Sequence, residues 1–317
     1  MARPNDIIRR SAALLVSAVL CGPLSSCVAK TGGGTEDGRV RVVATDFAMY
    51  DLARAVCGDT CDVRMLISPG SESHDFEATL ADIALIADTD VFVYVGGESE
   101  KWVDDVLEAS GTSAELVCAT ELVETYTVDD DTDHDHDHDT DHEHEHEIDE
   151  HVWTSIPNAL TIMEAIGAAV LREDEDFERQ NADYVAELLD IDAELRRTVE
   201  SSARHTIVFA DRFPFRYFTE EYGLDYYAAF SGCSSAVEPS LSTVNALIER
   251  VRSEDIPYIF VIEFSDRRTA EAIARETGAE ILELHSAHNV SRADFDSGVT
   301  YADLMRRNAE NLRLALN

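Results

Sequence analysis

The sequence predicts an α/β protein with two Rossmann-like lobes, each built on a parallel sheet and joined by a long rigid helix. Short apolar segments of strand length alternate with segments of helical spacing between residues 39 and 118, and again from residue 204 onward. Between these stretches, beyond residue 156, the pattern is helical nearly throughout. A ligand cleft is expected between the lobes, where strand ends and loops face it.

The first lobe is expected to span residues 39–172. A Pro69-Gly70 turn ends its second strand, and Thr79 is suited to cap the helix that follows. The predicted strands are residues 40–44, 63–67, 91–95 and 115–118, and the predicted helices are residues 47–56, 79–87, 102–107 and 157–171.

Residues 173–203 are predicted to form the linking helix, because they are highly charged and contain neither glycine nor proline. A helix of about 28 residues would span about 42 Å, enough to run along two lobes. The second lobe is expected to span residues 204–317. Its predicted strands are residues 206–210, 226–230, 258–264 and 280–284, and its predicted helices are residues 215–222, 240–252, 267–277 and 299–316.

The N-terminus has the pattern of a lipoprotein signal peptide over residues 1–26. Three arginines precede an apolar stretch at residues 11–20, which is too short to span a bilayer comfortably, and the sequence LSSC then ends at Cys27. Acylation of Cys27 would anchor the chain outside the cytoplasmic membrane of a bacterium. Residues 27–38 are interpreted as a flexible stalk.

The chain is strongly acidic, with a formal net charge of -39 over 317 residues. The excess of acids is not confined to one segment. This charge argues against a nucleic-acid partner, whose phosphates require a basic surface, and is compatible with attracting cations.

Residues 129–150 read DDDTDHDHDHDTDHEHEHEIDE, a tract in which histidines alternate with acidic residues. Imidazole and carboxylate both bind divalent metals, so the composition indicates an accessory metal-collecting loop. The alternative is a charged linker between two elements. The six histidines of the tract are His134, His136, His138, His142, His144 and His146.

Four further histidines stand in loops beside predicted strands or helices: His74, His151, His285 and His288. Side chains from such places can converge on a cleft, as a preformed metal site requires. A single histidine is more often structural or solvated, and His205 fits that interpretation.

Cysteines outside the signal segment would lie in an oxidising compartment. Cys57 and Cys61 flank a Gly-Asp-Thr turn and are candidates for a disulfide, whereas Cys118 and Cys233 are far apart in sequence and are expected to be free.

The chain resembles the metal-specific solute-binding lipoproteins of ABC importers over nearly its whole mature length. The resemblance rests on ATDFAMYDLARAVCGD, PGSESHDFEAT, EHVWTSIPNA, EYGL, VEPS and YADLMRRNAENLRLAL. Family members usually have PHDYEPT and PHVWLDP, in which both histidines bind the metal. The resemblance therefore implies that His74 and His151 are ligands in an interlobe site, that the chain is not an enzyme, and that its partners are a membrane permease and its ATPase.

The resemblance is incomplete at the third ligand, for which the family has a histidine or glutamate in segments such as FHDAF. Here the chain reads FADRFPF, and Asp211 is chosen because it alone in that segment offers a metal oxygen. His285 aligns with a late aspartate ligand of the family. The predicted site is therefore His74, His151, Asp211 and His285, with His288, Glu263 and Glu238 as reserves or neighbours of the ligands.

A shell rich in imidazole nitrogen suits Zn²⁺ as the transported ligand better than Mn²⁺, which prefers more oxygen ligands. A manganese receptor of the same family remains the alternative, as does a surface adhesin or metal-storage lipoprotein that works through its acidic tract. A zinc hydrolase is disfavoured, since the chain contains neither HExxH nor GxSxG.

Overall fold

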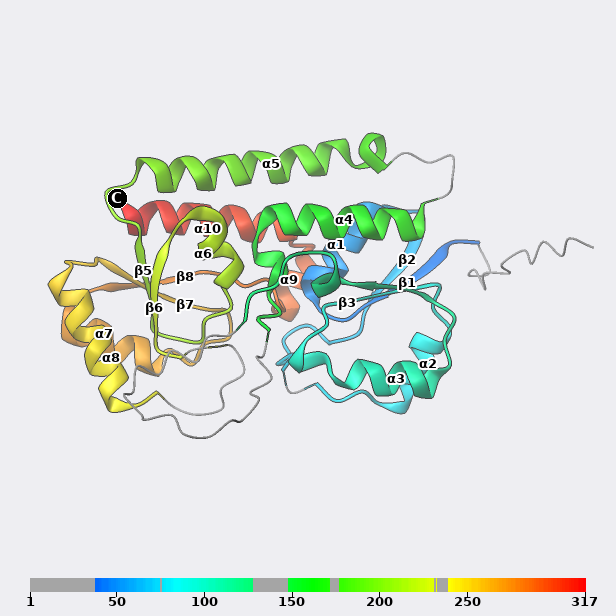
Figure 1. The fold of residues 1–317 in the computed structure, drawn as a ribbon, viewed down its shortest axis with the longest axis horizontal. Coiled ribbons are helices and arrows are strands. Elements are labelled where there is room, and N and C mark those ends of the chain that lie inside the picture. The colour runs from blue at the N-terminus through cyan, green and yellow to red at the C-terminus, as the bar shows by residue number, and fades with distance from the viewer. Residues whose placement is uncertain (1–37, 75, 128–147, 172–176, 231, 233–238) are drawn as a thin grey trace, which may run out of the picture. The chain divides into compact units, whose positions relative to one another are not determined.

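The computed structural model describes residues 38–74, 76–127, 148–171, 177–230, 232 and 239–317. These residues contain two four-stranded parallel sheets, with strand orders β2-β1-β3-β4 and β6-β5-β7-β8 (Figure 1). The predicted α/β class with two parallel-sheet lobes is confirmed. Several predicted features lie outside the described residues: the signal peptide, Cys27, the six alternating histidines, Cys233 and Glu238.

The first sheet is covered on both faces by helices, as a parallel sheet requires. In its central strand, Val42 and Ala44 join a core with α1 and α4, whereas Val43 packs on the other face with residues of α2 and α3. The strands are β1 (Val40–Ala44), β2 (Cys61–Met65), β3 (Val91–Tyr94) and β4 (Glu115–Cys118), and the helices are α1 (Phe47–Cys57), α2 (Leu80–Ala87), α3 (Trp102–Ser110) and α4 (Ile156–Val170).

The second sheet repeats this arrangement. Val208 packs with α7 and α8 on one face, while Phe209 belongs to the large core on the other face, to which α10 contributes. Its strands are β5 (Thr206–Phe209), β6 (Asp225–Ala228), β7 (Tyr258–Val261) and β8 (Glu280–Glu283), and its helices are α6 (Arg216–Tyr222), α7 (Leu241–Ser253), α8 (Arg268–Thr277), α9 (Arg292–Ser297) and α10 (Tyr301–Leu316).

The predicted linking helix is present as α5 (Phe177–Ser201). It lies along α10 and α4 and also contacts α1 and α6, so it packs on helices that cover both sheets (Figure 1). Leu188, Ile191 and Leu195 are buried at these contacts. Their spacing of three and four residues puts them on one side of the helix.

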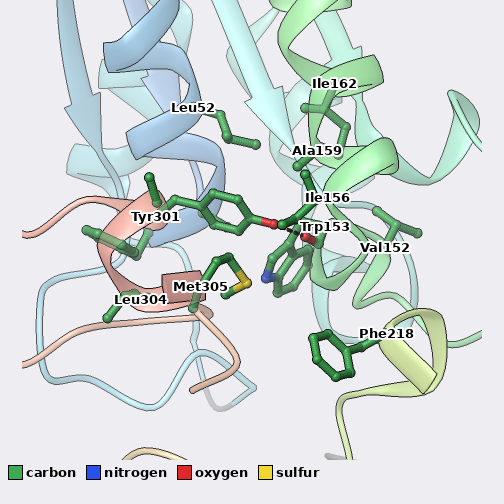
Figure 2. Packing of buried hydrophobic residues seen from close by; sticks show 14 of the residues in the cluster. Leu52, Val152, Trp153, Ile156, Ala159, Ile162, Phe218, Tyr301, Leu304 and Met305 are labelled. Atoms are coloured by element: carbon green, nitrogen blue, oxygen red, sulfur yellow. Dashed lines mark hydrogen bonds between the residues drawn. The ribbon is translucent and has the colours of Figure 1, made fainter. Parts of the chain in front are cut away.

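A continuous core joins the lobes around Trp153, which is fully buried (Figure 2). The Trp153 indole Nε1 donates to the Ser286 carbonyl at 2.8 Å, and the Tyr301 hydroxyl donates to the Trp153 carbonyl at 2.6 Å. Tyr301 opens α10, and its own N–H donates to the Asp51 carboxylate of α1 at 2.6 Å. The Trp153–Ser286 bond fixes the segment around residue 286 against the segment that carries His151.

Candidate metal centre

His74 lies in the loop between β2 and α2, and its side chain is 9% exposed. Gly70 turns this loop with a φ of +82°, and its N–H donates to the Val290 carbonyl at 2.8 Å. The loop ends where Thr79 and Asp82 form a capping box for α2. Both ring nitrogens of His74 are buried without a hydrogen-bond partner, which makes them available to a ligand.

His151 immediately precedes the 3-10 turn Val152–Thr154. The Asp149 Oδ1 lies 2.9 Å from both the backbone nitrogen and the Nδ1 of His151. An imidazole that donates its Nδ1–H to a carboxylate presents a lone pair on Nε2. The Asp149 pairing therefore orients His151 as a ligand through Nε2.

His288 reaches the first lobe from the second, because the chain crosses over after β8. The His288 carbonyl accepts the Phe47 N–H at 3.1 Å, and the side-chain amide of Asn289 donates to the Ser68 and Ser71 carbonyls at 3.0 and 2.8 Å. These backbone contacts hold the His288 side chain beside His74 and His151.

The three histidines His74, His151 and His288 form one group, each offering a ring nitrogen within 4.8 Å of the others. Their ring centroids are 4.8 to 5.8 Å apart. Nitrogens that share a tetrahedral zinc ion stand about 3.3 Å apart, since Zn–N bonds are about 2.0 Å. Small rotations of the rings therefore suffice to bring these nitrogens to a shared metal.

Burial keeps the imidazoles of His74 and His288 neutral, the form that binds metals. Burial and, to a smaller extent, the neighbouring His151 together lower the pKa of His74 to about 4. Burial also lowers the pKa of His288 well below its ordinary value, with added repulsion from His74 and His151.

Buried carboxylates surround the three rings. The Glu150 Oε1 lies 3.5 Å from the His74 Nδ1, and the Asp46 Oδ2 lies 3.7 Å from the His288 Nε2. Burial raises the pKa of Asp46 well above its ordinary value, and that of Glu100 to about 7. A bound cation would stabilise these acids in their charged form. Sequence reasoning missed Asp46, Asp149 and Glu150 as parts of the site; the acids directly before His151 were the available signal.

The predicted ligand His285 does not join this group. The His285 Nδ1 accepts the Ala287 N–H at 2.9 Å, while the His285 backbone bonds the Asn308 side chain of α10. Ala287 then adopts a φ of +61° and redirects the chain toward the first lobe. The reserve residue His288, rather than His285, is therefore in the histidine group.

Two other predicted residues have different neighbours. The Asp211 Oδ1 accepts the Arg212 N–H at 2.8 Å, and its buried Oδ2 has no hydrogen-bond partner; Asp211 is not in the histidine group. The Glu263 carboxylate accepts hydrogen bonds from the backbone N–H and the hydroxyl of Ser286, so it anchors the segment that follows β8, and it is not in the histidine group.

A pocket beside His288 is lined by residues of both lobes, including Ser73 and Glu263. Arg212, which follows β5, forms an ion pair across it with Glu72 of the β2–α2 loop at 3.2 Å. His288 of the histidine group therefore borders a pocket between the lobes.

In the structure Cys57 and Cys61 are buried thiols, and the predicted disulfide between them is not formed. A hydrogen bond with Cys61 and burial raise the pKa of the Cys57 thiol. Cys118 is also buried and forms no disulfide.

Residues 42–315 match the family model described as "Zinc-uptake complex component A periplasmic". The high-affinity zinc uptake system protein ZnuA of Bacillus subtilis is 32% identical over 308 residues, which cover 96% of this chain and 94% of that protein. The zinc-binding protein AdcA of Streptococcus pyogenes is 29% identical over 291 residues, covering 88% of this chain. The chain spans about half, 56%, of the length of that relative.

Solved structures share the fold. The metal-dependent lipoprotein YcdH of Bacillus subtilis matches with a TM-score of 0.72 and 27% identity, over 88% of this chain and 100% of that one. Zn(II)-bound AdcA of Streptococcus pneumoniae matches with a TM-score of 0.71 and 26% identity, over 88% of this chain and 58% of that one. The family is one of receptors rather than enzymes, as the sequence predicted. By its sequence along nearly the whole folded length and by its two-lobe fold, this chain belongs to the ZnuA family of periplasmic zinc-uptake components.

Proposed function

We propose that this chain captures Zn²⁺ outside the cytoplasm and delivers it to the permease of an ABC importer, which an ATPase drives. The observation that carries the proposal is the group of three imidazoles, of which His151 and His288 are buried and His74 is partly buried, with nitrogens within 4.8 Å of one another. Zinc-binding names among the relatives support the same cargo. Capture and release require no covalent chemistry.

The donor set favours zinc over manganese. Three neutral imidazoles and a fourth oxygen donor are a common tetrahedral shell for zinc, whereas manganese prefers more oxygen ligands. We assign His74, His151 and His288 as the nitrogen ligands. Asp211 remains a candidate for the oxygen, since its buried Oδ2 has no partner.

The proposed location of the chain is the outer face of the cytoplasmic membrane. The signal-peptide pattern, which ends in LSSC, predicts removal of residues 1–26 and acylation of Cys27. Within the described part of the chain, no helix is both long and apolar enough to cross a membrane. An anchor at Cys27 would keep the receptor close to its permease.

The acidic tract is proposed to collect cations loosely for the cleft. Its carboxylates attract cations but also favour protonated histidine, so its sites should be weaker than the buried one. The last three residues of the predicted tract are part of the folded structure. Ile148 forms an antiparallel β-bridge with Thr127, and Asp149 and Glu150 contact the proposed ligands.

Metal analysis tests the proposal directly. The chain without residues 1–27 would be dialysed against equal concentrations of zinc and manganese, washed with a weak chelator, and its metal content measured. We expect one zinc retained per chain and almost no manganese. Retention of manganese instead would refute the zinc assignment, and loss of both metals would refute the receptor assignment.

A further inference from the structure

Asp46, which follows β1, has a buried carboxylate oxygen without an obvious purpose. The Asp46 side chain is 1% exposed. Its Oδ1 caps α1 by accepting the Met49 N–H at 2.9 Å, but its Oδ2 is buried and has no hydrogen-bond partner. Leaving a buried polar atom without a hydrogen-bond partner costs free energy. The Asp46 Oδ2 is therefore expected to gain a partner when the site binds its metal.

The nearest candidate partner is His288. The Asp46 Oδ2 lies 3.7 Å from the His288 Nε2, slightly beyond a hydrogen bond. The backbones are already aligned, because the N–H of Phe47, the next residue after Asp46, donates to the His288 carbonyl at 3.1 Å. A small turn of the imidazole would complete the side-chain bond without moving either segment.

The other two proposed ligands have the same kind of neighbour. The His151 Nδ1 lies 2.9 Å from Asp149, and the His74 Nδ1 lies 3.5 Å from Glu150. Each imidazole thus turns one nitrogen toward its own buried carboxylate. A metal-binding histidine usually donates its second N–H to such a group, which fixes the ring and raises its basicity.

We propose that Asp46 is the positioning residue of His288: it accepts the Nε2–H and thereby directs Nδ1 to the zinc. The proposal rests on the zinc-binding function above. It makes His288 differ from His74 and His151, which would bind zinc through Nε2 because their Nδ1 atoms face carboxylates. Asp46 also adds negative charge beside a dication, which favours the metal-bound state.

The substitution Asp46→Asn separates this role from helix capping. Asparagine caps helices as well as aspartate does, so α1 should keep its N-terminus. With its oxygen at the cap, the amide would turn its NH₂ group toward the Nε2–H of His288, where it offers no acceptor. Asp46→Ser, which also caps, removes the partner altogether and serves as a second variant.

Zinc affinity would be measured on the folded chain by competition with a chromophoric chelator. We expect Asp46→Asn to weaken binding by about 10- to 100-fold, the usual effect of losing a histidine's carboxylate partner. In a His288→Ala background the same change should have less than about a twofold effect, because residues that act through one another are not additive. Unchanged affinity, or full additivity with His288→Ala, would overturn the proposal.

Asp51→Asn is the matched control, since Asp51 is an equally buried carboxylate of α1 that bonds Tyr301 and Tyr184 rather than a histidine. It should lower the unfolding temperature yet leave zinc affinity unchanged. Imidazole ¹⁵N NMR of the zinc-bound chain gives an independent readout: His288 should be metal-bound at Nδ1 and protonated at Nε2. Metal at Nε2 would overturn the assignment.

The two proposals fail in different ways. If the unmodified chain binds no zinc tightly, the receptor function is wrong. If it binds one zinc and Asp46→Asn binds it equally well, the role of Asp46 alone is wrong.

Discussion

His285 and His288 lie on opposite sides of Ala287, whose φ is +61°, and these two histidines, three residues apart, contact different lobes. His285 is bound into the second lobe through Asn308, whereas the His288 carbonyl is bonded to Phe47 of the first. Two histidines in the sequence HSAH therefore have separate tasks.

Replacing His288 with asparagine should weaken zinc binding by on the order of 100-fold or more, because a metal ligand matters at least as much as its hydrogen-bond partner. His285→Asn should change the affinity by less than about threefold, since the asparagine oxygen can take over the acceptor role of Nδ1 toward Ala287. Chelator competition measures both. His205→Asn, at an exposed position, is the control. A larger effect at His285 than at His288 would return the ligand assignment to His285.

Acid should release zinc from the tract before it releases zinc from the cleft. An ordinary histidine protonates near pH 6.5, but burial lowers the pKa of His74 to about 4. Protons therefore compete with zinc for His74 only as the pH approaches that value. Metal retention measured between pH 7 and pH 4 should show two steps, and the step at higher pH should vanish when the six tract histidines are changed to glutamine.

The same lowered pKa affects stability without metal. In the unfolded chain His74 has its ordinary pKa of 6.5. The folded chain favours neutral His74, so this residue contributes stability above pH 6.5. This contribution should be lost as the pH falls from 6.5 toward 4. Urea unfolding of the metal-free chain and of His74→Gln at several pH values checks this: the variant should lose less stability over that interval.

Gly97 should tolerate no side chain, because an added Cβ would lie 2.7 Å from the Glu150 Oε2 and 2.9 Å from its Cβ. Gly97→Ala is expected to cost at least about 2 kcal/mol, from strain at positive φ plus overpacking. It should also weaken zinc binding, since Glu150 faces His74.

Gly111 provides the matched control. Its φ of +58° is also positive, but an added Cβ meets nothing within 4 Å. Gly111→Ala should therefore cost about 1 kcal/mol from backbone strain alone and leave zinc affinity unchanged. If Gly97→Ala and Gly111→Ala lost the same amount of stability and the same amount of zinc affinity, Glu150 would have no part in the site.

The acidic tract should be dispensable for tight binding. Thr127 and Ile148 form an antiparallel bridge, so Asn-Gly in place of residues 128–147 would close a two-residue turn between them. This variant should keep one tightly bound zinc and lose the weaker sites, as counted by isothermal titration. Loss of nearly all zinc would instead support the metal-store alternative.

The sequence predicted the strands well where apolar runs are continuous, as in β1, β3 and β4. The predicted second strand was two residues late, because the polar residues Asp62 and Arg64 hide the beginning of β2, which pairs with β1 from Cys61 onward. Such a shift is expected where a strand is only half buried.

Two of the three histidines in the group were predicted from the sequence as ligands. His74 and His151 were identified through local motifs, and both are in the histidine group. His288 could not be chosen over His285 from the sequence. The choice depends on a positive φ at Ala287, which alanine rarely adopts and which no sequence pattern predicts. The proximity of Asp46 to His288 arises only from tertiary structure.

The segment after β8, which crosses from the second lobe to the first, has a consequence for metal release. His288 belongs by sequence to the second lobe, but its carbonyl is bonded to Phe47 and the Asn289 amide to Ser68 and Ser71. A rigid displacement of the second sheet would therefore leave all three imidazoles together on the first lobe. Under the proposed function, moving the lobes apart would therefore not be sufficient to release the metal, and release would require these backbone anchors to loosen.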